Sequence, residues 1–227
     1  MAADTSHSPR CRVLGEELER CEREDINRHT DRLAGRRKEE RKVMKLDPNR
    51  TWKLVEKRLA DERDPTLRRN LELVLAHMKA EAKGDIEGVV ATLTEHPRYV
   101  TYQNPDDPIL NPVGSKDAVR RFYDATIVQT GAHRLEFACD RVIVDESSVF
   151  TEGMMRMAYP GATLRAMGIE VEDPNAYYVA ESRMGVVWPV DPDELKLTGE
   201  EVYSSANPFD GIAGRKISLS DIAPLEA

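Results

Sequence analysis

The sequence predicts an α+β domain, in which helices come first along the chain and long antiparallel strands follow. From about residue 65 to residue 130, apolar residues recur at the three- and four-residue spacing of amphipathic helices. Beyond Gly131 their spacing changes to two, which is typical of strands that bury one face. Helices followed by long antiparallel strands are the order of an α+β fold.

Composition favours one domain with an extension. The chain has 227 residues, of which 40% are hydrophobic and 33% charged, and its formal net charge is -8. Residues 1–64 carry 17 Lys and Arg against 15 Asp and Glu, whereas residues 65–227 carry 16 against 26. An acidic body without a basic stripe neutralises phosphates poorly, so we expect no nucleic acid as a partner. No stretch approaches the roughly 20 apolar residues of a membrane span, so we expect no membrane partner.

The first residues and the cysteines favour the cytoplasm. The opening MAADTSHSPR lacks the apolar run of a secretory signal. Three cysteines are an odd and sparse set, which indicates free thiols in a reducing compartment.

The first element is a charged extension over residues 1–64. Arg, Glu, Lys and Asp dominate it, and Arg36 to Lys42 is a near-continuous run of charge. Such a composition buries little apolar surface, so we expect exposed helix and partial disorder. Met44 lies within this extension and is an alternative translation start, which N-terminal sequencing of the native protein would identify.

Two helices follow, with sequence signals at their ends. Asp64 is placed to cap the first helix and Pro65 suits its first turn, while Gly84 ends it. Asp85 caps a second helix, which we expect to continue until Pro97.

A short strand and a polar loop separate the second helix from a third. The strand covers Arg98 to Tyr102, and the loop from Gln103 to Pro112 is rich in Asn, Asp and Pro. Ser115 then opens the third helix, whose apolar side includes Tyr123.

Four strands complete the predicted domain, which covers residues 65–206. Residues 160–176 are too long for a tight hairpin loop, so we expect an insertion there with a possible short helix. Residues 207–227 read as an irregular tail. The expected strands pair as two hairpins and cover residues 133–144, 147–159, 177–190 and 195–205.

Two motifs carry a resemblance to a known superfamily. Gly84-Asp85-Ile86-Glu87 with its preceding helix, and GSKDAVRRFY at residues 114–123, resemble ketosteroid isomerase and the SnoaL-like polyketide cyclases of the nuclear transport factor 2-like superfamily. Over about residues 67–205, this resemblance implies a cone-shaped fold in which a curved sheet wraps three helices around an apolar pocket. It also implies a homodimer. Because the fold hosts enzymes and non-enzymes, it specifies architecture better than function.

The resemblance to ketosteroid isomerase implies an altered catalytic set. The helix Tyr of that enzyme corresponds to His77, which is able to act as acid, base or hydrogen-bond donor near neutral pH. The catalytic base falls at Asn104, an amide that cannot take a proton, so Asp106 or Asp107 would have to replace it. Tyr102 or Asn104 would then polarise the substrate carbonyl.

The resemblance also implies an apolar lining of the pocket. The oxyanion Asp of the isomerase falls at about Gly185 or Met184. The Asp-Arg-Asp set of the related limonene epoxide hydrolase falls on Gly153, on Met155 and near Val202. If these positions face inward, the pocket has a mostly apolar lining in which flexible Met side chains adapt to the substrate. We expect it to include Met155, Met157, Val187 and Val202.

Glu181 and Arg183 share a strand face with Val187. If that face points inward, the two form a buried ion pair or a substrate clamp, because unpaired buried charge is costly. If the assignment slips by one residue, both lie on the surface.

Each candidate also has a purely structural interpretation. His77 lies at the edge of the apolar stripe of its helix, a position that is also typical of a solvent-exposed histidine without a chemical role. Asn104, Asp106 and Asp107 are residue types that form turns. The apolar pocket residues are the types that fill any core.

The favoured function is a small cofactor-independent enzyme, an isomerase or lyase, acting on a hydrophobic carbonyl compound. It would isomerise, dehydrate or cyclise its substrate by general acid-base chemistry. The five His are dispersed without the spacing of a zinc or iron site, so we expect no metal. Two alternatives remain, a non-catalytic binding module for an apolar ligand and a dimeric interaction protein.

Overall fold

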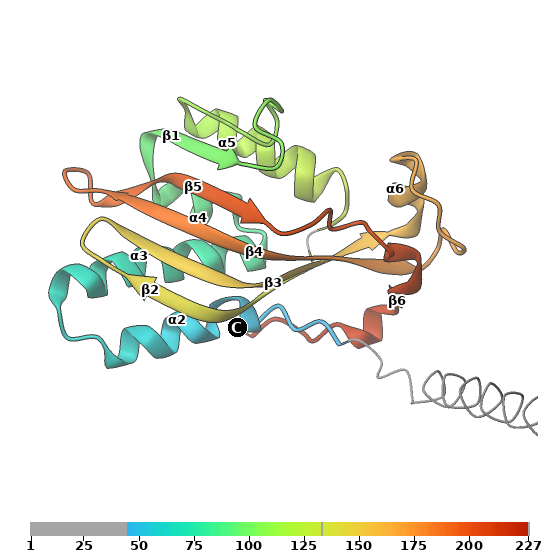
Figure 1. Cartoon of the computed structure of the whole chain (residues 1–227), viewed down its shortest axis with the longest axis horizontal. Helices are drawn as coiled ribbons and strands as arrows, with labels where there is room; N and C mark the ends of the chain where they lie inside the picture. The colour runs from blue at the N-terminus through green and yellow to red at the C-terminus, as the bar shows by residue number, and fades with distance from the viewer. Residues whose placement is uncertain (1–44, 133, 227) are drawn as a thin grey trace, which may run out of the picture. The chain divides into compact units, whose positions relative to one another are not determined.

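The computed structural model describes residues 45–132 and 134–226, which form five α-helices and a six-stranded sheet (Figure 1). Met44 and the charged run at residues 36–42 lie outside them. The helices are α2 (Arg50–Asp61), α3 (Pro65–Lys83), α4 (Ile86–Ala91), α5 (Lys116–Tyr123) and α6 (Gly161–Ala166). The strands are β1 (Leu93–Thr101), β2 (Leu135–Val144), β3 (Ser148–Pro160), β4 (Tyr177–Asp191), β5 (Lys196–Ser204) and β6 (Lys216–Ile217).

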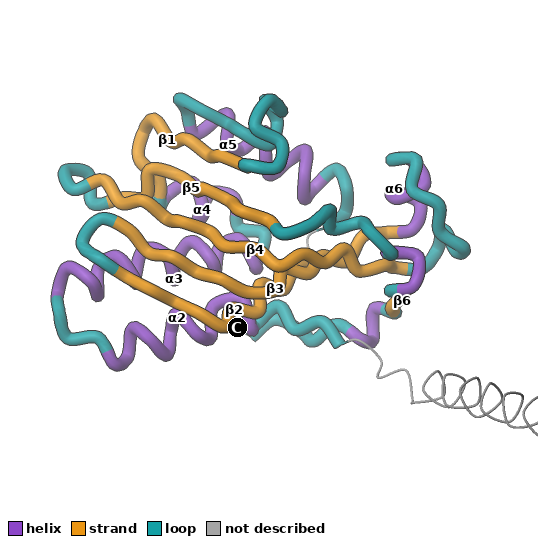
Figure 2. Tube along the Cα trace, in the orientation of Figure 1, coloured by secondary structure: helices purple, strands orange, loops and turns teal. Residues whose placement is uncertain are grey.

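The sheet is mixed and follows the order β1-β5-β4-β3-β2, with β6 paired to the start of β4 (Figure 2). β1 runs parallel to β5, whereas the other neighbours pair antiparallel. Figure 1 shows α3 and α4 crossing one face of the sheet, and apolar residues of α3, α4 and α5 join those of this inner face in one core cluster. The predicted α+β class and the mostly antiparallel sheet are confirmed.

The ends of α3 follow the sequence signals. The Asp64 carboxylate accepts hydrogen bonds from the backbone N–H groups of Thr66 and Leu67, at 2.8 and 3.1 Å, and Pro65 occupies the first turn. At the other end, Gly84 adopts a left-handed conformation with φ of 70°. The first predicted helix therefore begins and ends where expected.

The second predicted helix is shorter than expected, and β1 is longer. α4 ends at Ala91, where the Thr92 hydroxyl donates a hydrogen bond to the Val89 carbonyl. β1 already begins at Leu93, which pairs with Leu197 of β5. Pro97 lies inside this edge strand at a register shift, a position that tolerates a residue without an N–H group.

Residues 45–64 belong to the folded domain, although the sequence assigned them to the charged extension. Leu46, Trp52 and Val55 are buried, and the last two join the core cluster. Helix α2 contributes only this narrow apolar stripe to a charged segment. The charged composition of this segment therefore did not predict helix α2, because the burial of the helix depends on tertiary contacts.

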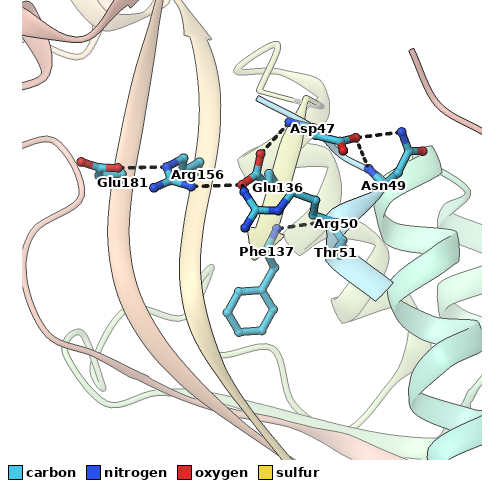
Figure 3. Close-up of polar contacts among 8 residues, drawn as sticks. All are labelled: Asp47, Asn49, Arg50, Thr51, Glu136, Phe137, Arg156 and Glu181. Carbon is cyan, nitrogen blue, oxygen red and sulfur yellow. Dashed lines mark hydrogen bonds and ion pairs between the residues drawn. The ribbon is translucent and has the colours of Figure 1, made fainter. Parts of the chain in front are cut away.

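A buried carboxylate anchors the start of this segment to β2 (Figure 3). The fully buried side chain of Glu136 accepts hydrogen bonds from Arg50 and Arg156, each at 3.0 Å. Arg156 also pairs with Glu181 at 3.0 Å, so the contacts continue from α2 across three strands. Beside them, the Thr51 hydroxyl accepts from the backbone N–H of Phe137 at 3.1 Å. Strand β2 thus has its edge covered by residues of its own chain.

The C-terminal residues pack against the same segment. The Asn49 side chain donates to the Pro224 carbonyl at 2.9 Å and accepts from the Glu226 N–H at 2.8 Å. Leu46 and Ile222 form a bridge between the two chain segments. The predicted tail is therefore ordered from β6 onward. Within the described ranges, no helix has both the length and the apolar character that crossing a membrane requires.

Candidate functional site

A cluster of polar side chains lies inside the core, where α3, α5, β1 and β5 meet. Its buried members carry an imidazole, a carboxylate, two phenols and a hydroxyl, and we call them the buried polar cluster: His77, Thr92, Tyr99, Tyr123 and Glu200. Buried polar groups are costly unless they are hydrogen-bonded, so a concentration of them in a small core requires an explanation.

His77 is hydrogen-bonded through both of its ring nitrogens. Its Nδ1 lies 2.8 Å from the Thr92 hydroxyl, and its Nε2 lies 3.1 Å from Oε1 of Glu200. The single hydroxyl proton of Thr92 goes to the Val89 carbonyl at 2.6 Å, so Nδ1 must be the donor toward Thr92. Nε2 faces the Glu200 carboxyl group, so an imidazole and a carboxyl group share one hydrogen bond inside the core.

Two phenols lie next to this hydrogen bond between His77 and Glu200. The Tyr123 hydroxyl lies 3.3 Å from Oε1 of Glu200 and 3.4 Å from Nε2 of His77. The Tyr99 hydroxyl is buried and has no hydrogen-bond partner among the described residues, although it lies near Tyr123 and Glu200. Burial, and then the negative charge of Glu200, raises the pKa of both phenols well above the ordinary value. Both are therefore neutral hydrogen-bond donors.

A second carboxyl lies beside the cluster. Glu81 follows His77 by one helical turn on the same side of α3. Burial, and then the charge of Glu200, raises the pKa of Glu81 to about 8. At neutral pH its carboxyl group is therefore mostly protonated and available as a hydrogen-bond donor.

A glycine in β5 turns Glu200 toward the core. Leu197 and Val202 both pack inward although they have opposite parity, and the pairing of β5 shifts between them. Gly199 lies at this shift with φ of 140°, and a Cβ there would come 1.9 Å from the Arg98 carbonyl oxygen. Only glycine fits this conformation and approach.

The cluster has apolar walls, and a cleft lies next to it. Trp188 packs edge-on against His77, with ring centroids 5.2 Å apart. A cleft of about 830 Å³ is lined in part by Ala82 and Ile127. Ala82 follows Glu81 directly, and Ile127 follows Tyr123 by one turn. Ala82 and Ile127, which are buried and form the floor of the cleft, thus come from the helical segments that carry Glu81 and Tyr123.

The predicted loop residues lie away from this cluster. Tyr102 is exposed and stacks on Tyr203 with ring centroids 4.4 Å apart. Asn104 and Asp106 are exposed. The Asp107 carboxylate accepts from the backbone N–H of Ile109 at 2.8 Å, so it stabilises the turn. This is the structural interpretation of the loop, and the structure does not bring it to His77.

The predicted lining residues divide between the two faces of the sheet. Met155, Met157 and Val202 face inward and pack against the core cluster, and their contact with a substrate stays a prediction. Contrary to expectation, Val187 points outward, together with the other residues on its face of β4. Its neighbours Val186 and Trp188 are the ones in the core.

Glu181 and Arg183 therefore lie on the outer face too. Glu181 pairs with Arg156, and Arg183 pairs with Asp140 and Glu152 at 2.9 and 2.7 Å. The one-residue slip in the assignment of faces, which reverses every side chain of a strand, accounts for the difference. These ion pairs lie on the outer face of the sheet, so Glu181 and Arg183 do not point toward the predicted pocket.

The cluster holds residues that the sequence did not single out as chemical. The sequence pattern does not distinguish Glu81 and Glu200, and it places Tyr123 among the packing residues of its helix. The helical spacing of Glu81 from His77 was a usable signal. No signal marked Glu200, because strict alternation from Leu197 places it outward. Within the part of the chain that the structure describes, no three His, Cys, Asp or Glu side chains gather as a metal site would require.

Comparison with known proteins identifies the fold. Residues 74–173 match the SnoaL-like domain. A putative SnoaL-like polyketide cyclase from Shewanella putrefaciens CN-32 superposes with a TM-score of 0.54 at 10% identity, covering 71% of this chain and 93% of that one. One from Shewanella denitrificans OS-217 gives 0.52 at 13% identity, covering 64% and 96%. At these identities the likeness shows the fold alone. No curated protein matches the sequence significantly.

Proposed function

Because the chain carries a SnoaL-like domain with the nuclear transport factor 2-like fold, we propose that the buried polar cluster is the acid-base centre of a small cofactor-independent isomerase, dehydratase or cyclase. Its substrate is a hydrophobic carbonyl compound. The observation that carries the proposal is the hydrogen bond between His77 and Glu200 beside a buried Tyr99 hydroxyl that has no partner among the described residues. A purely structural cluster has no need of an unsatisfied donor.

Each group has a defined part in the proposed reaction. The carboxylate of Glu200, hydrogen-bonded to His77, removes a proton from the carbon next to the substrate carbonyl. The electron pair of that C–H bond moves onto the carbonyl oxygen. The Tyr99 hydroxyl and the neutral carboxyl of Glu81 donate hydrogen bonds to the resulting oxyanion. The proton then returns to another carbon of the substrate, or to a leaving hydroxyl group.

The cleft beside Ala82 and Ile127 supplies the route for the substrate. The members of the cluster are buried from solvent. The proposal therefore requires side chains next to Ala82 and Ile127 to move so that a substrate reaches the cluster from the cleft. Apolar walls around a few polar groups are the usual composition of a small-molecule site.

Proton exchange at carbon tests this proposal without knowledge of the natural substrate. We would incubate the full-length protein with 2-tetralone, a hydrophobic ketone, in D2O and follow loss of the α-proton signal by NMR. The wild-type protein should accelerate exchange, and Glu200→Gln should slow it by a factor of roughly 100 or more. Tyr99→Phe removes only an unpartnered hydroxyl, so it should fold normally and still exchange more slowly.

The matched control is Asp106→Asn, a change in the exposed loop, which should leave the exchange rate unaltered. If Glu200→Gln and Tyr99→Phe are folded and exchange the ketone as fast as the wild-type protein, the assignment of the cluster is wrong. If the wild-type protein binds the ketone without any exchange, a binding module replaces the enzyme.

A further inference from the structure

The cleft next to the buried polar cluster has a lining that is apolar apart from two side chains. It is built from the end of α3, the start of α4, the π-helical turn Asp124–Val128 with the residues after it, and the C-terminal segment. Its volume of about 830 Å³ lies in the range of small-molecule sites. The lining residues are Pro48, Ala82, Lys83, Gly84, Ile86, Ile127, Val128, Gly131, Arg134, Leu219, Ile222, Ala223 and Leu225.

Both charged side chains in this lining are cations. Lys83 comes from the last turn of α3, and Arg134 from the residues just before β2. Among the residues that the structure describes, no carboxylate lines the cleft, although the whole chain carries a net charge of -8. The charge of the cleft lining is therefore positive, opposite in sign to the net charge of the protein, and it favours anionic ligands.

Within the described ranges, the two cations have no carboxylate partner. Neither Lys83 nor Arg134 forms an ion pair with another of the described residues. The Arg134 guanidinium lies 5.3 Å from the ring centroid of Tyr177, which holds its side chain in place by a cation–π contact. By contrast, Arg120, Arg156 and Arg183 elsewhere on the domain all pair with carboxylates.

We infer that this cleft recognises an apolar acid, and that Arg134 and Lys83 bind its anionic group. The inference rests on the proposed function and names its substrate class: a hydrophobic carbonyl compound that also carries a carboxylate or an ionised enol or phenol. The apolar walls bury the hydrocarbon part, and the planar guanidinium fits a carboxylate with two parallel hydrogen bonds. The anion anchors one end of the substrate while the floor of the cleft directs the other end toward Glu81 and Tyr123.

Binding of a matched acid and amide tests the inference. We would measure the affinity of the full-length protein for naphthalene-2-carboxylate and for naphthalene-2-carboxamide by calorimetry. The two probes have the same hydrocarbon part and differ in charge. The carboxylate should bind about tenfold more tightly or better, the usual effect of a charge-assisted hydrogen bond.

Variants of the cleft separate charge from shape. Arg134→Gln should reduce the affinity for the carboxylate about tenfold while leaving the affinity for the amide unchanged, which also shows that the cleft is intact. Val128→Asp adds a negative charge at an exposed lining position and should weaken the carboxylate alone. Arg141→Gln, a change on the outer face of β2, is the matched control and should alter neither affinity.

Two further outcomes separate this inference from the proposed function. Glu200→Gln should lose proton exchange of the neutral ketone and keep its affinity for the carboxylate probe. Equal affinities for acid and amide, no binding of either, or an unaltered affinity in Arg134→Gln would overturn the inference, even if the wild-type protein exchanges the ketone. Tight, Arg134-dependent binding of the acid would sustain it, even if no exchange occurs.

Discussion

At the scale of single residues, the main feature of this protein is that its buried ionisable groups lie next to one another. His77 and Glu200 are buried in the core, the half-buried Glu81 lies beside them, and the charge of Glu200 raises the pKa of Glu81. Two carboxyl groups in an apolar core cannot both ionise cheaply, so one keeps its proton. The same arrangement that disfavours charge provides a donor and an acceptor side by side, as acid-base chemistry needs.

The raised pKa of Glu81 predicts a stability that falls as the pH rises. The carboxyl group has an ordinary pKa of 4.5 in the unfolded chain and about 8 in the folded one. Between these values the folded state binds more protons, so its stabilising contribution is complete below pH 4.5 and is lost as the pH passes 8. The slope is at most about 1.4 kcal/mol per pH unit. Denaturant unfolding of Glu81→Gln should lack this slope and should show greater stability than the wild-type protein at pH 9. Identical pH profiles of the two proteins would contradict the shift.

At the scale of elements, an irregularity in β5 decides what the core contains. The shift at Gly199 reverses the alternation of the strand, so that Glu200 points inward. The inner face of β4 alternates regularly, through Ser182, Met184, Val186 and Trp188. Without this bulge Glu200 would point outward, and the core would have no carboxyl group from β5.

Replacement of Gly199 should disturb this bulge. In Gly199→Ala the new methyl group would meet the Arg98 carbonyl oxygen, and the residue would keep an unfavourable φ of 140°. We expect a loss of stability of roughly 1–3 kcal/mol and a movement of Glu200 out of the cluster. Urea unfolding measures the first, and the exchange of 2-tetralone measures the second. Gly214→Ala is the control, because nothing lies within 4 Å of a Cβ there. If both variants unfold at the same urea concentration as the wild-type protein, the close contact at Gly199 has no energetic consequence.

At the scale of the whole domain, the segment that precedes the SnoaL-like match is part of the fold. The match begins at residue 74, but α2 already buries Trp52 and Val55, and Glu136 binds Arg50. The C-terminal residues close over the same segment through Asn49. The beginning and the end of the described chain therefore stabilise each other beside β2.

Truncation tests how much of the stability this segment supplies. A chain that begins at Arg63 should lose a large part of its stability, because burial of Trp52 and Val55 alone is worth about 3–6 kcal/mol. Single domains have only about 5–15 kcal/mol in total. A chain that begins at Met44 retains every described contact and serves as the comparison. Thermal unfolding by circular dichroism would measure both, and similar midpoints would show that α2 is dispensable.

The sequence by itself determined the order and type of the elements from α3 onward, but not helix α2. Apolar periodicity and the end signals at Asp64, Gly84 and Ser115 predicted α3, the start of α4, α5 and the four long strands to within a few residues. These features depend on neighbours along the chain, which the sequence shows directly. The GSKDAVRRFY motif and the Gly84 turn carried the fold as well, and the match to the SnoaL-like domain confirmed it.

Only the tertiary structure decided which side chains share the core. The resemblance to ketosteroid isomerase pointed to His77. Its hydrogen-bond partners Thr92, Tyr123 and Glu200 lie 15, 46 and 123 residues away along the chain. The register of β4 and the bulge at Gly199 placed Val187 outside and Glu200 inside, and a shift of one residue exchanges the two faces of a strand. Periodicity records that a strand has two faces. Which of them is buried depends on pairing with distant strands and on the helices that cover the sheet.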